Sequence, residues 1–301
     1  RIGSIKSRLR LPAICAPMFL VTGPDMVISA CKSGVLGTFP STNARTEEQL
    51  VSWLDQISTS ITKADAPWAL NMITHNSYGR FDAELDLVRQ YQPELVITAL
   101  GGPHRVTDFV HGYGGLVFAD VNSPKFARKA IEKGADGLVL ICAGAGGHTG
   151  EYAIIPFVEE VRTFFDGPII VGGGIGTGRG IKAVEALGVD FAYLGTRFLA
   201  CQESLINDDY RQMVWDSQME DLIASRAITG ALGNWMRASV EAAGLTEEAM
   251  KAVAKIDFSQ DMHAGTKAWK HVWSAGQGVG LVNAPETVAD VVETLVRQYS
   301  T

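Results

Sequence analysis

The chain has 301 residues, of which 47% are hydrophobic and 20% are charged, and its formal net charge is −7. An apolar fraction of this size excludes a mainly disordered chain. The negative charge excludes a general nucleic-acid binder, which needs an excess of Lys and Arg facing phosphates. Since no apolar run approaches the roughly 18 residues that a membrane span requires, we expect neither a nucleic acid nor a membrane as partner.

The four cysteines, at positions 15, 31, 142 and 201, are widely separated along the chain. They form no Cys-x-x-Cys pair and no Cys/His spacing typical of zinc sites, so no metal is expected. In a chain this long and apolar we expect reduced, mostly buried thiols and no disulfide framework. The basic segment Arg1–Arg10 is not followed by a signal-peptide core and cleavage site, and a cytoplasmic location is the default expectation.

Eight short apolar runs recur along the first two thirds of the chain. Each is nearly continuously hydrophobic, as expected of parallel strands that are covered on both faces. In chain order they are Pro12–Ala16, Val35–Phe39, Trp68–Ile73, Leu95–Leu100, Leu116–Val121, Gly137–Cys142, Pro168–Val171 and Phe191–Leu194.

Amphipathic segments lie between these runs. Ser123 before Pro124 and the Thr46-to-Gln49 spacing are typical helix starts, and glycines 134 and 188 stand where helices should end. The alternation of eight strands with helices predicts an α/β fold. A count of eight favours a closed (β/α)8 TIM barrel rather than an open doubly wound sheet. The expected helices include Thr46–Ile57, Asp82–Tyr91, Pro124–Lys133, Pro156–Phe165 and Arg179–Leu187.

The alternation is interrupted after Phe198. Residues 202–265 are rich in helix formers and show no strand pattern, so we predict a helical insertion after the eighth strand, with residues 1–201 and 266–301 forming the barrel. An insertion beside the strand ends often forms a lid over the site, and a purely structural appendage is the alternative. The helical candidates are Tyr210–Ser217, Trp235–Ala243 and Thr246–Val253, and the chain resumes with Trp269–Gly280 and a final helix, Pro285–Tyr299.

Two glycine-rich loops follow the seventh and eighth strands. The first, V-G-G-G-I-G-T-G-R, contains Gly173 and Gly174, and the second, L-G-T-R-F, contains Gly195 and Thr196. Glycines let backbone N–H groups approach an anion, and a helix N-terminus adds partial positive charge. Because barrels frequently bind phosphate in these two loops together, we predict a phosphate site there. The pattern matches neither a dinucleotide fingerprint nor a P-loop.

A third loop, A-G-A-G-G-H-T-G, follows the sixth strand and contains Gly147 and His148. Its small residues let a flat ring lie against the backbone while the histidine reaches over it. Imidazole, with an ordinary pKa of about 6.5, accepts or donates a proton at neutral pH. We therefore predict that His148 is catalytic, with a structural or solvated histidine as the alternative. His75 and His104 are weaker candidates to line the site.

Residues at other strand ends complete the pattern. Ala16 and Met18 follow the first strand, Asn71 ends the third, and Gln277 precedes the final helix. Methionine and small residues can pack against a flat cofactor ring, and amides can bond to its polar edge. Taken singly, Met18 would be a core residue and Asn71 a turn residue.

Together these motifs resemble the nitronate monooxygenase family, once called 2-nitropropane dioxygenases, whose members are FMN-dependent barrels. The resemblance covers nearly the whole chain. It implies that FMN is the cofactor and that His148 lies near the substrate. It further implies that the FMN phosphate is held by Gly173, Gly174, Gly195 and Thr196, and that the flavin lies along Ala16, Met18, Asn71, Gly147 and Gln277.

The resemblance also implies a reaction. Similar enzymes oxidise alkyl nitronates with O2 to a carbonyl compound and nitrite, so a small nitronate and O2 are the expected partners, and a homodimer is compatible with the sequence. Where a neutral nitroalkane is accepted, His148 would remove its α-proton. A nitronate is already ionised, and His148 would then bind and orient the anion.

One position departs from the family pattern. The fifth strand ends in A-D-V-N, where some relatives place a lysine near the flavin. We include Asp120 among the cofactor-binding residues, where its charge would disfavour an anionic reduced flavin. The alternative is that Asp120 turns away and caps the helix at Pro124.

Two other functions stay open at this point. The same scaffold and histidine loop occur in enoyl-acyl-carrier-protein reductases and NAD(P)H:quinone reductases, which pass a hydride onward from reduced FMN. A flavin-free isomerase or aldolase would instead use the two glycine loops for a phosphorylated substrate, although no lysine at a strand end suggests a Schiff base.

Overall fold

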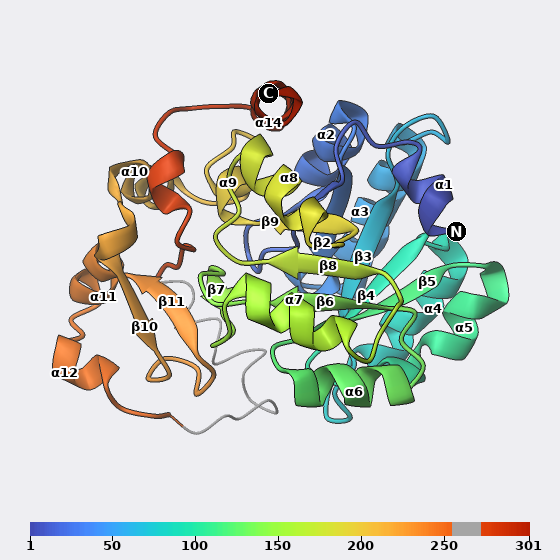
Figure 1. Ribbon diagram of the computed structural model, residues 1–301, viewed down its shortest axis with the longest axis horizontal. Helices are drawn as coiled ribbons and strands as arrows, with labels where there is room; N and C mark the ends of the chain where they lie inside the picture. Colours follow the sequence, from blue (N-terminus) through green and yellow to red (C-terminus); the bar gives the residue numbers. More distant parts are fainter. Residues whose placement is uncertain (255–271) are drawn as a thin grey trace.

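The computed structural model describes residues 1–254 and 272–301. Eight parallel strands close into a barrel in the order β1-β2-β3-β4-β5-β6-β8-β9, with helices around the outside (Figure 1). The predicted TIM barrel is therefore confirmed, and each of the eight apolar runs matches one strand to within one residue at each end. The strands are β1 (Ala13–Cys15), β2 (Leu36–Pro40), β3 (Trp68–Ile73), β4 (Leu95–Ala99), β5 (Leu116–Val121), β6 (Gly137–Ile141), β8 (Ile169–Gly172) and β9 (Phe191–Leu194).

Helix boundaries follow the capping residues that the sequence displays. The Thr46 hydroxyl accepts the Gln49 N–H (3.2 Å) and the Ser123 hydroxyl accepts the Phe126 N–H (3.3 Å), as predicted. The helices around the barrel are α1 (Ile2–Lys6), α2 (Pro24–Ser33), α3 (Glu47–Ser60), α4 (Phe81–Tyr91), α5 (Thr107–Tyr113), α6 (Pro124–Glu132), α7 (Ile154–Arg162), α8 (Gly178–Ala186), α9 (Thr196–Leu199) and α14 (Val288–Ser300), with short 3-10 turns η1 (Ser41–Asn43), η2 (Pro103–Arg105) and η4 (Val279–Leu281).

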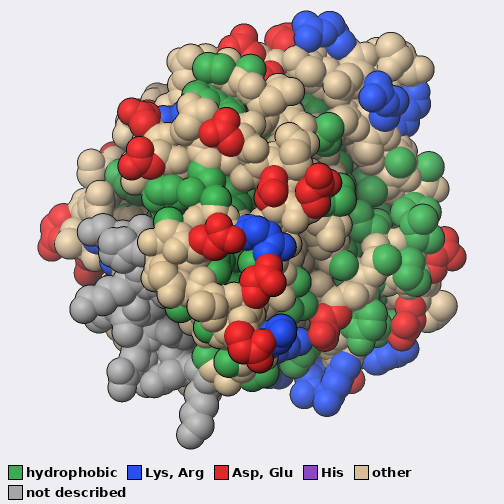
Figure 2. All heavy atoms as spheres, turned by 90° about the vertical axis from the view of Figure 1, so that its left-hand side faces the viewer, with side chains coloured by type: hydrophobic (Ala, Val, Ile, Leu, Met, Phe, Trp, Pro, Cys, Tyr) green, Lys and Arg blue, Asp and Glu red, His purple; other side chains and the backbone are tan. Residues whose placement is uncertain are grey.

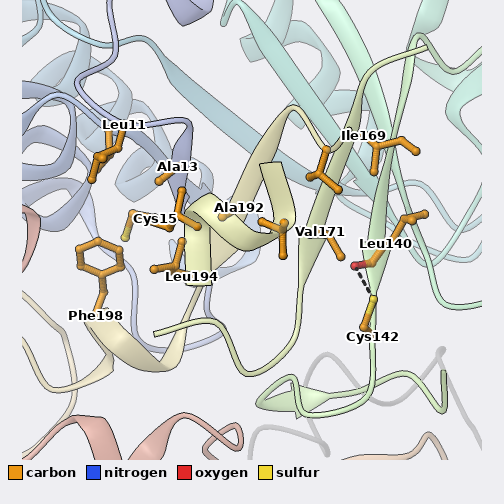
Figure 3. Close-up of a cluster of buried hydrophobic side chains, with 14 of the residues drawn as sticks. Leu11, Ala13, Cys15, Leu140, Cys142, Ile169, Val171, Ala192, Leu194 and Phe198 are labelled. Carbon is orange, nitrogen blue, oxygen red and sulfur yellow. Dashed lines mark hydrogen bonds between the residues drawn. The ribbon is translucent and has the colours of Figure 1, made fainter. Parts of the chain in front are cut away.

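Side chains of each strand alternate between two environments, because successive residues point to opposite faces of the sheet. One set fills the barrel interior and includes Ile14, Ala69, Phe118 and Phe191. The other set packs under the helices, and Figure 3 shows part of it, including Cys142, whose thiol donates to the Leu140 carbonyl (3.6 Å). All four cysteines are buried and none forms a disulfide, as expected.

The insertion contains strands, so the prediction of a strandless segment is wrong. Strands β10 (Leu222–Ser225) and β11 (Gly233–Met236) form an antiparallel hairpin, and β11 also pairs with β7 (Gly147–His148). The segment was misread because its strands have only four residues each, and because β7, the second partner of β11, lies far away in the sequence. Its remaining elements are α10 (Asp208–Asp216), η3 (Met219–Asp221), α11 (Arg237–Ala242) and α12 (Glu247–Met250).

The insertion stands beside the barrel, at the left of Figure 1, with β11 next to β7. Figure 2 shows this side, where acidic side chains are spread over the face with apolar side chains between them. The 265/266 boundary and the start of the Trp269–Gly280 segment lie outside the described residues, so the proposed domain limits stay predictions. Within the described ranges, no helix is both long and apolar enough to cross a membrane.

Candidate active site

The two predicted phosphate loops lie side by side, because their strands β8 and β9 are neighbours in the barrel. Gly173 and Gly174 have φ angles of 145° and 70°, a region that favours glycine. A Cβ on Gly173 would lie 2.8 Å from the Ala143 carbonyl oxygen. The N–H groups of Gly173, Gly174, Gly195 and Thr196 donate to no backbone carbonyl in the described ranges. The loops therefore form a cradle of N–H groups at the C-terminal end of the barrel.

The histidine loop and the segment before η4 pack against this cradle. The Gly276 N–H donates to the Thr196 hydroxyl (2.8 Å), and the Gln277 N–H donates to the Gly144 carbonyl (2.9 Å). A Cβ on Gly146 would lie 2.7 Å from the Gly276 nitrogen. Glycines are thus required where the two segments touch, and Gln277 lies against the loop that carries His148.

The residues after β1 reach the second phosphate loop. A Cβ placed on Gly195 would lie 3.5 Å from the Met18 sulfur and 3.9 Å from the Ala16 Cβ. Asn43, which sequence reasoning missed, holds this segment. Its side-chain oxygen accepts the Leu20 N–H (2.8 Å), and its side-chain nitrogen donates to the Met18 carbonyl (2.9 Å). No local sequence motif predicts such a role for a single asparagine after β2.

A polar group forms the top of the barrel interior. Asn71 and Asp120 stand two residues beyond the inward-facing Ala69 and Phe118, so they also face inward. The Asn71 amide donates to the Ile97 carbonyl (3.2 Å) and, at 3.4 Å, to the Asp120 Oδ2. Helix α6 is capped by Ser123, and the alternative cap by Asp120 is therefore not adopted.

Two polar atoms of this group are buried without a hydrogen-bond partner among the described residues, the Asp120 Oδ1 and the Tyr193 hydroxyl. Such atoms are costly and call for a ligand or another explanation. Burial raises the pKa of Asp120 to about 7, against a smaller lowering by the bond from Asn71. Burial, with a smaller effect of Asp120, raises the pKa of Tyr193 well above its usual value. Tyr193 was missed because it reads as one more apolar residue of the last strand.

His148 lies on β7, opposite Gly233 of the insertion hairpin. Its Nε2 is 3.0 Å from the Thr229 hydroxyl oxygen. The His148 side chain keeps accessible surface, although many protein atoms lie around it. Burial lowers the pKa of His148, so the imidazole is neutral at pH 7 and able to accept a proton.

The other two candidate histidines have the following surroundings. His75 bonds through Nδ1 to the Ser77 hydroxyl (2.7 Å), and His104 is an exposed residue of η2. Trp235 of β11 is completely buried in an apolar cluster with Val240, Met250 and Val272. Within the described residues, no group of three or more His, Cys, Asp or Glu side chains is arranged to bind a metal.

Comparisons with known proteins agree with this arrangement. The chain is 28% identical over 221 residues to (3aS,4S,5R,7aS)-5-hydroxy-7a-methyl-1-oxo-octahydro-1H-indene-4-carboxyl-CoA dehydrogenase of Rhodococcus jostii, a match covering 73% of this chain but 60% of that protein. It is 27% identical over 277 residues to a nitronate monooxygenase of Paraburkholderia phytofirmans, covering 77% of this chain and 75% of that protein.

The structure has the same fold as the nitroalkane oxidase from Streptomyces ansochromogenes, with a TM-score of 0.83 and 22% identity over 99% of this chain and 98% of that one. A sequence profile of the family described as nitronate monooxygenase matches residues 43–298. Since that match spans most of the sequence, the chain belongs to the nitronate monooxygenase family.

Proposed function

We propose that this protein is a flavin-dependent oxidoreductase that uses O2 to oxidise alkyl nitronates to a carbonyl compound and nitrite. The observation that carries the proposal is the convergence of the N–H cradle after β8 and β9 with the loop of His148. Membership of the nitronate monooxygenase family supports the same conclusion, as does the nitronate monooxygenase among its relatives.

FMN is the cofactor that these residues fit. Its phosphate would be held by the N–H groups of the cradle, where a helix N-terminus adds favourable charge. The two unpartnered atoms, Asp120 Oδ1 and the Tyr193 hydroxyl, would meet its polar groups. When bound, FMN supplies the electron acceptor that the protein side chains lack. The predicted flavin contacts are Ala16, Met18, Asn71, Asp120, Gly147 and Gln277.

The protein's own residues then have distinct tasks. His148, neutral at pH 7, takes the α-proton of a neutral nitroalkane, and with a nitronate it orients the anion. Asp120, whose pKa burial raises to about 7, is mainly protonated in mildly acidic solution. It would therefore place less negative charge beside the flavin than an ordinary aspartate would. The expected penalty of Asp120 on an anionic reduced flavin is smaller for that reason.

The test is aerobic turnover of propyl-2-nitronate with nitrite detection, using protein that has been reconstituted with FMN. The expected result is a yellow protein that absorbs at about 450 nm, releases FMN on denaturation and forms nitrite. Protein that binds no flavin after reconstitution would contradict the proposal. A homodimer and a cytoplasmic location stay predictions.

A second candidate is an FMN-dependent oxidoreductase acting with a nicotinamide nucleotide on thioesters or quinones. The specific observation in its favour is the similarity to the octahydro-indene-carboxyl-CoA dehydrogenase of Rhodococcus jostii, whose name indicates a CoA thioester substrate. Anaerobic NADH or NADPH should bleach the flavin quickly in such an enzyme and have little effect on a nitronate oxidiser. NADH oxidation with a quinone, run beside the nitrite assay, separates the two.

A further inference from the structure

The turn of residues 18–22, which follows β1, brings Met18 to the second phosphate loop. The Val21 and Thr22 N–H groups both donate to the Met18 carbonyl oxygen (3.1 Å each). The Met18 N–H donates to the Thr22 hydroxyl (2.8 Å). A Cβ on Gly195 would lie 3.5 Å from the Met18 sulfur. The shape of this turn therefore decides where the Met18 side chain lies beside the loop of Gly195.

The backbone of this turn is strained at its middle residue. Leu20 has a φ of 62°, in the left-handed region. The Cβ of a leucine makes this region unfavourable, whereas glycine adopts it freely. Such a conformation persists only where the surrounding structure holds it in place. The fold must therefore supply a group that prevents Leu20 from returning to a negative φ.

Asn43, a buried residue of η1, supplies that group. Its side-chain oxygen accepts the Leu20 N–H (2.8 Å). Its side-chain nitrogen donates to the carbonyl oxygens of Met18 (2.9 Å) and Thr22 (2.8 Å). A carboxamide has two N–H donors and one acceptor oxygen, and here all of them are directed at one turn. The first, middle and last residues of the turn are thus bonded to one side chain.

The residues on both sides of Asn43 are bonded to the start of helix α4. The Ser41 hydroxyl donates to the buried Glu84 carboxylate at Oε2 (2.6 Å). The Arg80 guanidinium donates to the Ala44 carbonyl oxygen (2.8 Å) and forms an ion pair with Glu84 (3.2 Å). Asn43 is therefore held by contacts that do not depend on the turn after β1.

We propose that Asn43 is a positioning residue for the cofactor, which holds the turn after β1 in its strained shape and so keeps Met18 at the FMN site. The inference rests on the proposed function, because it takes Met18 as a flavin contact. Without the Asn43 side chain, three backbone groups lose their partner and Leu20 can relax, which displaces Met18. Glycine at position 20 would remove the strain, and the turn would then keep its shape without Asn43.

The test is fluorescence titration of the apoproteins with FMN. Asn43→Ala should raise the dissociation constant about tenfold, because buried groups lose their hydrogen bonds. Adding Leu20→Gly should return it to within about threefold of the wild type. Leu20→Ala in the same background is the matched control, because it removes the same side chain beyond Cβ but keeps the strain. Equal dissociation constants for the two double variants would overturn the proposal.

Stability is followed in parallel through the melting temperature of each apoprotein. If Asn43→Ala does not fold, Asn43→Asp takes its place, because it keeps the volume and the acceptor but loses both donors. The same rescue by Leu20→Gly and the same failure of Leu20→Ala are expected in that background. Wild-type affinity for FMN in a folded Asn43→Ala protein would refute the role of Asn43.

A second readout needs no flavin. Hydrogen exchange of the Val21 and Thr22 amides in the apoprotein reports their bonds to the Met18 carbonyl. Asn43→Ala should speed this exchange about tenfold, and Leu20→Gly, unlike Leu20→Ala, should slow it again. Unchanged exchange in Asn43→Ala would overturn the proposal. Wild-type protein that binds no FMN would instead refute the proposed function, and the exchange rates would still decide whether Asn43 holds the turn.

Discussion

Gly276 is the position where one added methyl group should damage the cofactor site while leaving the barrel intact. A Cβ there would lie 2.6 Å from the Gly144 carbonyl oxygen, 2.8 Å from the Gly146 nitrogen and 3.0 Å from the Thr196 hydroxyl oxygen. Two of these are backbone atoms, which cannot rotate aside. The φ of Gly276 lies outside the left-handed range, so alanine acts there by contact and not through backbone strain.

The expected loss of FMN affinity follows from the contacts that the added methyl group displaces. Relief of the overlap separates residues 275–277 from the histidine loop and weakens two hydrogen bonds, Gly276 N–H to Thr196 (2.8 Å) and Gln277 N–H to Gly144 (2.9 Å). Each contributes about 1 kcal/mol, and overpacking costs about 1–3 kcal/mol. A perturbation of about 3 kcal/mol in the arrangement that holds the flavin corresponds to about a 100-fold weaker affinity for FMN.

Gly278→Ala is the matched control, because the nearest atom to its Cβ would be the Gly174 carbonyl oxygen at 3.6 Å, an ordinary contact. The assay is fluorescence titration of the apoprotein of each variant with FMN, together with its melting temperature. Gly276→Ala should bind FMN far more weakly than Gly278→Ala. Equal dissociation constants for the two variants would refute the steric reasoning.

Three further predictions rest on single side chains. His148→Ala should keep its yellow colour and lose about 10²–10⁴-fold in nitroethane turnover, measured as nitrite formed; an unchanged rate would remove His148 from the mechanism. Asp120 has a pKa raised to about 7 by burial, so it binds its proton more tightly when folded, and its contribution to stability, complete below about pH 4, should fall as pH rises to 7 by at most about 4 kcal/mol. Urea unfolding at several pH values should show that this slope is smaller in Asp120→Asn, and identical slopes would contradict the assignment. Trp235→Ala should cost about 3–5 kcal/mol of folding free energy, because the side chain is completely buried; a change in KM with an unchanged melting temperature would contradict this.

The barrel was predictable because its signal is local. Each strand is a continuous apolar run that packs on both faces, and β3, β5 and β9 have the bounds that the sequence predicts. Helix α2 was missed although Pro24 begins it and Gly34, with a φ of 92°, ends it. The hairpin β10–β11 had no comparable signal, because its strands have only four residues each and the second partner of β11, β7, lies far earlier in the chain.

The residues of the candidate site also fall into those that could be predicted from the sequence and those that could not. The glycines of the cradle could be placed from the sequence, because their position follows from being next to strands β8 and β9. The pairing of Asn71 with Asp120, the unpartnered hydroxyl of Tyr193 and the contact between Thr229 and His148 depend on how distant segments meet. Contacts between segments that are distant in the sequence leave no periodicity or motif from which they could be predicted. The catalytic and cofactor-binding roles themselves stay predictions until they are measured.

The pairing of β7 with β11 bears on how this protein could be recombined with its relatives. Exchanging the insertion for that of another family member would also exchange the edge that completes the two-residue strand of His148. A donor segment one residue longer or shorter in its hairpin would present every side chain on the opposite face of the ribbon. Successful chimeras should therefore be those that transplant the hairpin and the histidine loop as one cassette.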